Sequence, residues 1–79
     1  MPSYAIRYSD RAATQKRNLP AAHRASLEVL EKRLTSDPYG FGAKSNKDNS
    51  WSAFFTGGFI NYVVSNNHLM INVINVASS

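Results

Sequence analysis

The sequence predicts an α+β domain of order βααβββ, in which a helical hairpin packs on one face of a small, mainly antiparallel four-stranded sheet. Two patterns carry this prediction: helical periodicity between residues 11 and 36, and strand-like alternation between residues 51 and 76. A third observation is a short strand-like segment at residues 4–8, before the helices. With 79 residues, the chain forms one domain that spans residues 1–79.

The first strand leads directly into the first helix. Aromatic and β-branched residues alternate with smaller or polar ones over residues 4–8, which favours a strand. Ser9 can then cap a short helix over residues 11–17. Asp10 suits the first turn of this helix, because its carboxylate lies near the positive end of the helix dipole.

A second helix is predicted over residues 20–36. One face of this helix holds residues spaced four, three and four positions apart: His23, Leu27, Leu30 and Leu34. Pro20 suits the first helical turn, and Pro38 ends the helix because the residue before a proline disfavours helical angles. His23 lies on the apolar face, so we expect it to have a structural role.

Three strands complete the predicted sheet after a loop over residues 39–50. The strands span residues 51–55, 59–64 and 69–76, with turn signals at residues 56–58 and 65–67. Simple alternation puts Ile71 and Val73 on one face of the last strand, and Ile74 and Val76 on the other. A strand that is apolar on both faces is usually interior to its sheet, so we expect the first strand to lie beside it.

Composition excludes several classes of protein and site. There is no Cys, which argues for a reducing compartment and against thiol chemistry and Cys-based zinc sites. The two His are far apart, which argues against a metal site, and no phosphate-binding loop is present. Without a signal peptide or an apolar run of membrane-spanning length, we expect a cytoplasmic protein with no metal or cofactor.

Charge is confined to the first part of the chain. The net charge is +4, and all nine Lys and Arg and all five Asp and Glu precede residue 49. A basic protein favours an acidic partner, either a nucleic acid or an acidic protein segment. Basic side chains are candidates for contacts to RNA phosphates, with an ordinary solvated surface as the alternative: Arg11, Lys16, Arg17 and Arg24 on the helices, and Lys44 and Lys47 in the loop.

Short motifs follow one another in a characteristic order. YAIRYSDRA, with a helix start at Ser9 to Ala12, precedes LP, a helix ending in SDPYG, a Gly-rich loop, and the strands FFTGGFINYVV and LMINVINV. In this order the motifs resemble the RelE/ParE superfamily of toxins from type II toxin–antitoxin systems, over nearly the whole chain. The resemblance implies the RelE-like βααβββ fold and a cytoplasmic toxin that a cognate antitoxin holds inactive.

The resemblance implies two kinds of activity. RelE-like members bind the ribosome and cleave mRNA in the decoding site, using basic and aromatic side chains of the sheet to drive attack by the 2′-hydroxyl. ParE-like members inhibit DNA gyrase. We therefore expect a toxin that inhibits translation by ribosome-dependent, metal-independent mRNA cleavage, as an mRNA interferase. The alternatives are a non-enzymatic gyrase inhibitor and a degenerate toxin that only binds its antitoxin.

The nuclease residues of the superfamily do not carry over to this sequence. The basic residues of the family's second strand fall near Trp51 and Ala53, and its third-strand Arg falls near Ile60, or near Phe59 if the register slips by one. The Arg or His and the Tyr that usually follow the fourth strand have no counterpart at residues 76–79. Any catalysis must therefore use other residues.

RNA cleavage needs a group that accepts the 2′-hydroxyl proton and donors that stabilise the phosphorane charge. His68 is the catalytic candidate, because histidine ordinarily titrates near neutral pH; an exposed turn histidine is the alternative. Arg7 is a further cationic candidate. Aromatic side chains could stack on bases, although alternation sends about half of them into the core; they are Trp51, Phe54, Phe55, Phe59 and Tyr62.

The uncharged segment from residue 49 onward is expected to be covered. Strands without charge or Pro tend to aggregate, and edge strands pair with other chains. The cover is either an antitoxin segment, bound as a helix in a groove or as an added strand, or a second copy of the chain in a homodimer through the sheet.

Overall fold

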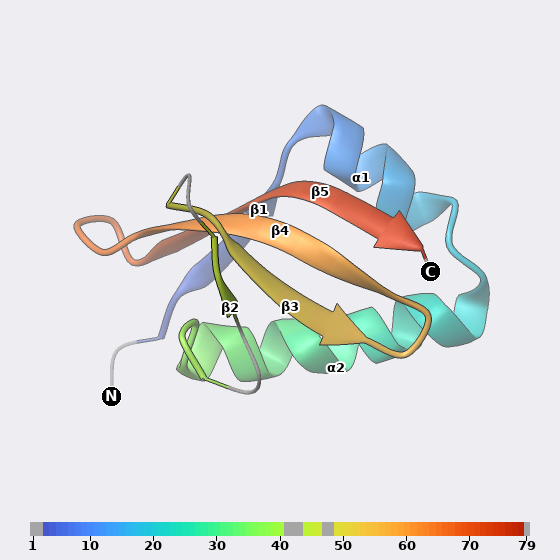
Figure 1. Ribbon diagram of the computed structural model, residues 1–79, viewed down its shortest axis with the longest axis horizontal. Helices are drawn as coiled ribbons and strands as arrows, with labels where there is room; N and C mark the ends of the chain where they lie inside the picture. The colour runs from blue at the N-terminus through green and yellow to red at the C-terminus, as the bar shows by residue number, and fades with distance from the viewer. Residues whose placement is uncertain (1–2, 41–43, 47–48, 79) are drawn as a thin grey trace.

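The computed structural model describes residues 3–40, 44–46 and 49–78. Two helices pack against one mixed sheet, which confirms the predicted α+β architecture (Figure 1). In chain order the elements are β1 (Ala5–Tyr8), α1 (Asp10–Arg17), α2 (Ala21–Ser36), β2 (Lys44–Ser45), β3 (Trp51–Phe55), β4 (Gly58–Ser65) and β5 (Met70–Ser78). Every predicted helix and strand is therefore present, and no end differs from its predicted position by more than two residues.

The sheet has five strands in the order β1-β5-β4-β3-β2. The additional strand, β2, lies in the predicted loop, where Lys44 and Ser45 pair with β3. β1 runs parallel to β5, and the other neighbouring strands are antiparallel. β5 is thus interior to the sheet and lies beside β1, as its apolar sequence predicted.

The helices bury one face of the sheet. Ser9 caps α1, since its Oγ accepts a hydrogen bond from the Ala12 N–H at 3.1 Å. α2 runs along the sheet in Figure 1 and turns its predicted apolar stripe towards the core. Leu27, Leu30 and Leu34 of this stripe are buried. In the described part of the chain, no helix is long and apolar enough to cross a bilayer.

Tyr62 of β4 lies at the centre of the core and is fully buried. Its hydroxyl donates a hydrogen bond of 2.6 Å to the carbonyl oxygen of Pro38, directly after α2. Burial, aided by the nearby Asp37 carboxylate, raises the pKa of Tyr62 to about 12. Tyr62 therefore ties the end of α2 to the sheet, and it is not available for stacking on a base.

A β-bulge in β5 changes which of its residues face the core. Val73 and Asn75 lie opposite consecutive residues of β4, so Ile74 is the extra residue. Ile74 is 43% exposed, whereas Val73 and Val76 are both buried. The prediction that Val73 and Val76 point to opposite faces is therefore wrong, because simple alternation takes no account of the bulge.

The β3–β4 hairpin rests on α2 through a close glycine contact. Gly57, at the hairpin turn, has a φ of +104°, which favours glycine. A Cβ at this position would overlap the ring of His23. His23 Nδ1 is buried and has no hydrogen-bond partner in the described part of the chain. His23 thus packs beneath the hairpin, as its place on the apolar helix face predicted.

Candidate functional site

The open face of the sheet, opposite the helices, presents side chains from all five strands. Alternation, register and burial place the following residues on it: Arg7, Ser52, Phe54, Phe59, Asn61, Val63, Asn72 and Asn75. Lys44 of β2 pairs with Ser52 and extends this face to the far edge. Its two described cationic side chains, Arg7 and Lys44, thus lie on the two edge strands of the sheet.

Amide and hydroxyl side chains cross the open face in a continuous chain, here called the polar ladder. Gln15 Nε2 of α1 donates to Asn75 Oδ1 at 3.1 Å, and Asn75 Nδ2 donates to Asn61 Oδ1 at 3.0 Å. Asn61 Nδ2 donates to Ser52 Oγ at 2.8 Å. Asn46, which follows β2, donates to the same hydroxyl oxygen at 3.0 Å. The polar ladder therefore connects α1 to the β2 edge across the sheet.

Gln15 takes the place of a strand at the edge of β5. β1 pairs with β5 only as far as Val73, whose carbonyl oxygen accepts a hydrogen bond of 3.0 Å from the Ser9 N–H. Further along β5, the Val76 N–H donates to Gln15 Oε1 at 2.8 Å. α1 thus continues the edge of the sheet where β1 ends, and this contact fixes the first member of the polar ladder.

The polar ladder is suited to binding and not to proton transfer. Amide and hydroxyl groups stay neutral and can both donate and accept hydrogen bonds, so they match base edges and ribose hydroxyls. Sequence reasoning missed this feature. Strand alternation alone could have placed Ser52 and Asn61 outward. It could not have placed Asn75, which depends on the bulge, or Gln15, which comes from a helix.

Two of the five aromatic candidates lie on the open face. Phe54 is 58% exposed, and the centroid of its ring lies 6.0 Å from that of Phe59. Trp51 and Phe55 instead pack against the core, and Tyr62 lies within it. The expected division of the aromatic residues is confirmed, and an apolar stacking surface remains beside the polar ladder.

A cavity of about 250 Å³ lies on the open face near the β4–β5 turn. It is lined by Arg7, Ser65, His68, Met70 and Asn72. His68 is exposed, and its Nδ1 lies 3.1 Å from Ser65 Oγ. The other ring nitrogen, Nε2, has no partner among the described residues and can meet a ligand. The structure thus brings the catalytic candidate His68 together with Arg7.

The turn that carries His68 is held at both ends. The hydroxyls of Tyr4 and Tyr39 each donate a hydrogen bond of 2.9 Å to Asn66 Oδ1. Leu69, next to His68, has a left-handed φ of 49°, and its carbonyl oxygen accepts a hydrogen bond of 2.8 Å from the Ala5 N–H. A non-glycine residue with such a φ persists where its surroundings hold it, so the position of His68 is determined by tertiary contacts.

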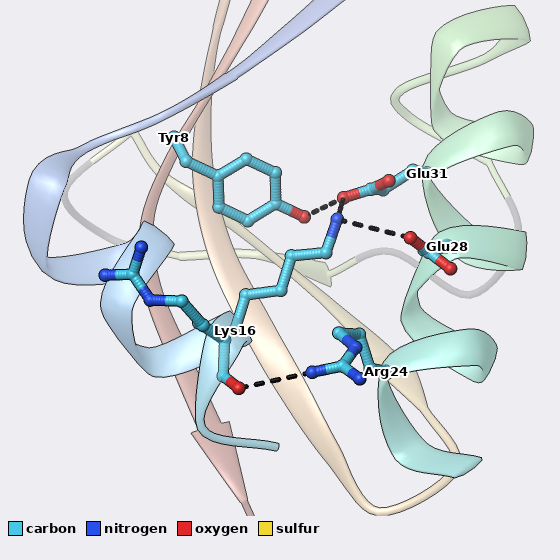
Figure 2. A network of polar contacts seen from close by, with 6 residues as sticks. Tyr8, Lys16, Arg24, Glu28 and Glu31 are labelled. Atoms are coloured by element: carbon cyan, nitrogen blue, oxygen red, sulfur yellow. Dashed lines mark hydrogen bonds and ion pairs between the residues drawn. The ribbon is translucent and has the colours of Figure 1, made fainter. Parts of the chain in front are cut away.

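Three of the predicted RNA-binding residues line one cleft between α1 and α2. This basic cleft has a volume of about 290 Å³ and is formed by Tyr8, Ala13, Lys16, Arg17 and Arg24. It lies on the helical side of the molecule, and Figure 2 shows its charged groups. The basic cleft and the open face are therefore separate surfaces.

Lys16 is already engaged within the protein. Its Nζ lies 2.9 Å from Glu31 Oε2 and 3.9 Å from Glu28 Oε2, and 5.0 Å from the centroid of the Tyr8 ring (Figure 2). The Tyr8 hydroxyl donates to the same Glu31 oxygen. Burial, together with this carboxylate, raises the pKa of Tyr8 far above its ordinary value. Lys16 therefore stabilises the packing of β1, α1 and α2, and it is not a free phosphate contact.

The remaining basic candidates are dispersed. Arg11 lines a different cavity, of about 510 Å³, between α1 and the end of β5. Lys44 lies at the β2 edge, and Lys47 is outside the described residues. The superfamily carries basic residues near strand positions that include Ala53 and Ile60. In this chain, Ala53 and Ile60 are buried beneath the helices. The predicted residues thus form several sites instead of one.

Comparisons with known proteins agree with this architecture. No family model and no curated protein sequence matches the chain. Among solved structures, the RelBE2 toxin–antitoxin complex from Mycobacterium tuberculosis matches with a TM-score of 0.88 at 17% identity, over 98% of this chain and 99% of that one. The E. coli RelBE complex matches with a TM-score of 0.87 at 19% identity, over 98% of both chains.

A third solved structure, the YoeB/ParE toxin from Agrobacterium tumefaciens, has a TM-score of 0.81 at 14% identity, over 95% of this chain and 98% of that one. Each match covers at least 95% of this chain and of the matching chain. They confirm the fold that the order of the sequence motifs predicted. The chain therefore has the fold of the RelE/ParE superfamily of toxins.

Proposed function

We propose that the chain is the toxin of a type II toxin–antitoxin system and inhibits translation by cleaving mRNA on the ribosome. In this proposal the protein is cytoplasmic, a cognate antitoxin holds it inactive, and the open face of the sheet contacts RNA. The fold supports the first part, because two of the matching structures are toxin–antitoxin complexes.

The cavity that contains both Arg7 and His68 is the observation that carries the cleavage step. His68 Nε2 accepts the proton of a 2′-hydroxyl as its oxygen forms a bond to phosphorus. The Arg7 guanidinium stabilises the charge on the phosphorane. The bond from phosphorus to the 5′-oxygen then breaks, and that oxygen takes a proton from water. The protonated His68 returns its proton to the hydroxide that is left. The products are a 2′,3′-cyclic phosphate and a 5′-hydroxyl.

Mapping mRNA ends on translating ribosomes tests this proposal. We expect wild-type protein to produce new ends at the decoding site, and we expect His68→Ala and Arg7→Ala each to lower the cleavage rate about 100-fold. Asn67→Ala is the matched control, because Asn67 is an exposed neighbour in the same turn and does not line the cavity. Full cleavage by His68→Ala would exclude His68 as the base.

The neutral polar ladder favours a second candidate, a toxin that binds its target without cutting. Cationic donors are absent from the centre of the described open face, where hydrogen bonding and stacking groups predominate. Intact mRNA together with blocked supercoiling by DNA gyrase would support such an inhibitor. If neither activity is found, co-expression with the protein encoded next to this chain tests whether the chain only binds an antitoxin.

A further inference from the structure

We propose that the hydroxyl of Ser52 in β3 acts only as a hydrogen-bond donor and selects RNA bases that carry a carbonyl group, such as uracil. The base rests on the exposed phenylalanine rings of the open face, and its exocyclic oxygen accepts the Ser52 proton. The inference rests on the proposed function in one respect, namely that the open face contacts RNA. It adds a base preference and the residue that sets it.

The direction of the polar ladder is fixed by a backbone group. The Val76 N–H can only donate, so the atom of Gln15 that it meets at 2.8 Å is Oε1. The other atom of this amide, Nε2, therefore donates to Asn75 Oδ1 at 3.1 Å. Asn75 in turn donates to Asn61 at 3.0 Å, and Asn61 donates to Ser52 Oγ at 2.8 Å. Reversing any one of these amides would place two donors or two acceptors in contact.

Ser52 has no lone pair left for a ligand. Its Oγ accepts a second hydrogen bond, of 3.0 Å, from Asn46 Nδ2 on the β2 side. A hydroxyl group has two lone pairs and one proton, so Asn61 and Asn46 together occupy both lone pairs. No residue in the described part of the chain accepts the Ser52 proton. A serine that could otherwise donate or accept is thereby restricted to donating.

Two phenylalanine rings lie beside Ser52 on the same face. Phe54 pairs with Phe59 on the same two strands on which Ser52 pairs with Asn61, two residues further along. Alternate residues of a strand share a face and are about 7 Å apart, so the rings and the Ser52 hydroxyl are neighbours. Phe54 is 58% exposed, and exposed aromatic rings stack on any base. The rings thus supply a surface for a base, and Ser52 meets its edge.

The exocyclic group of the base decides whether the Ser52 proton finds an acceptor. Uracil and guanine carry a carbonyl oxygen at this position, whereas cytosine and adenine carry an amino group, which donates. An amino group facing Ser52 would place two donors in contact and leave the serine proton unpaired. The second carbonyl of the pyrimidines lies next to the ribose and is common to uracil and cytosine, so it does not distinguish them.

This base site is separate from the cavity that contains Arg7 and His68. Three strand spacings separate β3 from β1 in the sheet, which places Ser52 about 14 Å from Arg7. Ser52 does not line that cavity. The base at Ser52 and the phosphate at Arg7 therefore belong to different nucleotides, and a change at Ser52 leaves the groups proposed for cleavage in place.

An NMR titration of labelled protein with uridine and cytidine RNA hexamers tests the preference without ribosomes. The side-chain amide signals of Asn61 and Asn46 report directly on binding at the site. We expect the uridine hexamer to bind about tenfold more tightly than the cytidine hexamer, the effect of about one hydrogen bond. Equal affinities, a preference for cytidine, or binding that leaves these signals unchanged would overturn the inference.

Two variants separate the donor from the contact that restricts it. Ser52→Ala removes the proton, so the ratio of the two affinities should fall below about twofold. Asn46→Ala keeps the serine but frees one of its lone pairs for the cytosine amino group, so the ratio should fall in the same way. If Asn46→Ala keeps the wild-type ratio, Ser52 is not restricted to donating and the inference fails. If Ser52→Ala does not fold in urea unfolding experiments, Asn46→Ala decides.

Phe54→Ala and Ser36→Ala are the controls. Loss of the Phe54 ring should weaken both hexamers by a similar factor and leave their ratio unchanged, because stacking tolerates any base. Ser36 is an exposed serine at the end of α2, and Ser36→Ala should change neither affinity. A ratio that falls as far in Ser36→Ala as in Ser52→Ala would contradict the role of Ser52.

The result for the base site is distinguishable from the result for cleavage. If mRNA is cleaved on ribosomes but the two hexamers bind equally or not at all, this inference fails while the proposed function stands. If the uridine preference is found but mRNA stays intact, the cleavage step fails and the base site stands.

Discussion

The helical layer and the open face of the sheet satisfy their polar groups in opposite ways. In the helical layer, charged groups meet across three elements, with Lys16 Nζ 2.9 Å from Glu31 and the Tyr8 hydroxyl on the same carboxylate. On the open face, neutral side chains from four elements are hydrogen-bonded in series, from Gln15 of α1 through β5 and β4 to Ser52 of β3. Both networks join distant parts of the chain.

This difference separates two tasks. Attraction between charges acts at long range and is screened by salt, so the contacts of the helical layer depend on ionic strength. Neutral amides and exposed aromatic rings act only at contact, so the open face is suited to groups that fit its shape. Because a phosphorane needs cationic donors, any cleavage on this face depends on Arg7 at its rim.

A substitution at Gly57, where the β3–β4 hairpin of the sheet touches His23 of α2, should give the largest loss of stability. Gly57→Val places a Cβ against the His23 ring at a φ of +104°, so we expect a loss of about 2–4 kcal/mol in the free energy of unfolding. Urea unfolding measures this loss. In a His23→Ala background, the same substitution should cost less, since only the backbone strain remains. An equal cost in both backgrounds would show that the two regions are not coupled here.

High pH should lower the free energy of unfolding, because tyrosines that pack between the sheet and the helices ionise. The amide and hydroxyl groups of the polar ladder do not change their charge. The pKa of Tyr62 is raised from 10.0 to about 12 by folding, so the unfolded chain loses this proton first. The stabilisation is complete below pH 10 and is lost as the pH rises to about 12, at about 1.4 kcal/mol per pH unit. The pKa of Tyr8 is also raised by folding, so its ionisation lowers the stability at high pH in the same direction.

Urea unfolding between pH 9 and pH 11 measures this dependence, and Tyr62→Phe should flatten it. A variant that keeps the full slope of the wild type would contradict the assignment to Tyr62. The comparison is made with slopes and not with absolute stabilities, because Tyr62→Phe also removes the hydrogen bond to Pro38.

Removing Lys16 should have a smaller effect that depends on salt. Lys16→Met keeps most of the side-chain stem and leaves the shielded Glu31 carboxylate without its cation, so we expect a loss of about 1–2 kcal/mol. The loss should shrink as NaCl rises from 0.05 to 0.5 M in urea unfolding. Lys32→Met, at an exposed position of α2, is the control and should cost less than about 0.5 kcal/mol.

The polar ladder should show the smallest loss and no dependence on salt. Asn61→Ala removes the hydrogen bonds to Asn75 and Ser52, so we expect a loss of about 1 kcal/mol in the free energy of unfolding. The same salt series should leave this loss unchanged. A loss that depends on salt as strongly as that of Lys16→Met would mean that the two regions do not differ in the way described.

Most of the fold could be predicted because it follows local rules. The leucine spacing of α2, the Ser9 cap and the alternation of β3 and β4 each depend on residues that are close in sequence. β2 was missed because its two residues become a strand only by pairing with β3. His68 was placed correctly at a turn, but its proximity to Arg7 depends on the parallel pairing of β1 with β5.

The sequence by itself determined the order of the elements, the apolar faces that form the core, and the confinement of charge to the first part of the chain. The tertiary structure alone decided which polar groups meet. The bulge at Ile74 sets Asn75 opposite Asn61, and the packing of α1 brings Gln15 to the edge of β5. The physical reason is that periodicity fixes the direction of a side chain within its own element, whereas a partner from another element is fixed by register and packing.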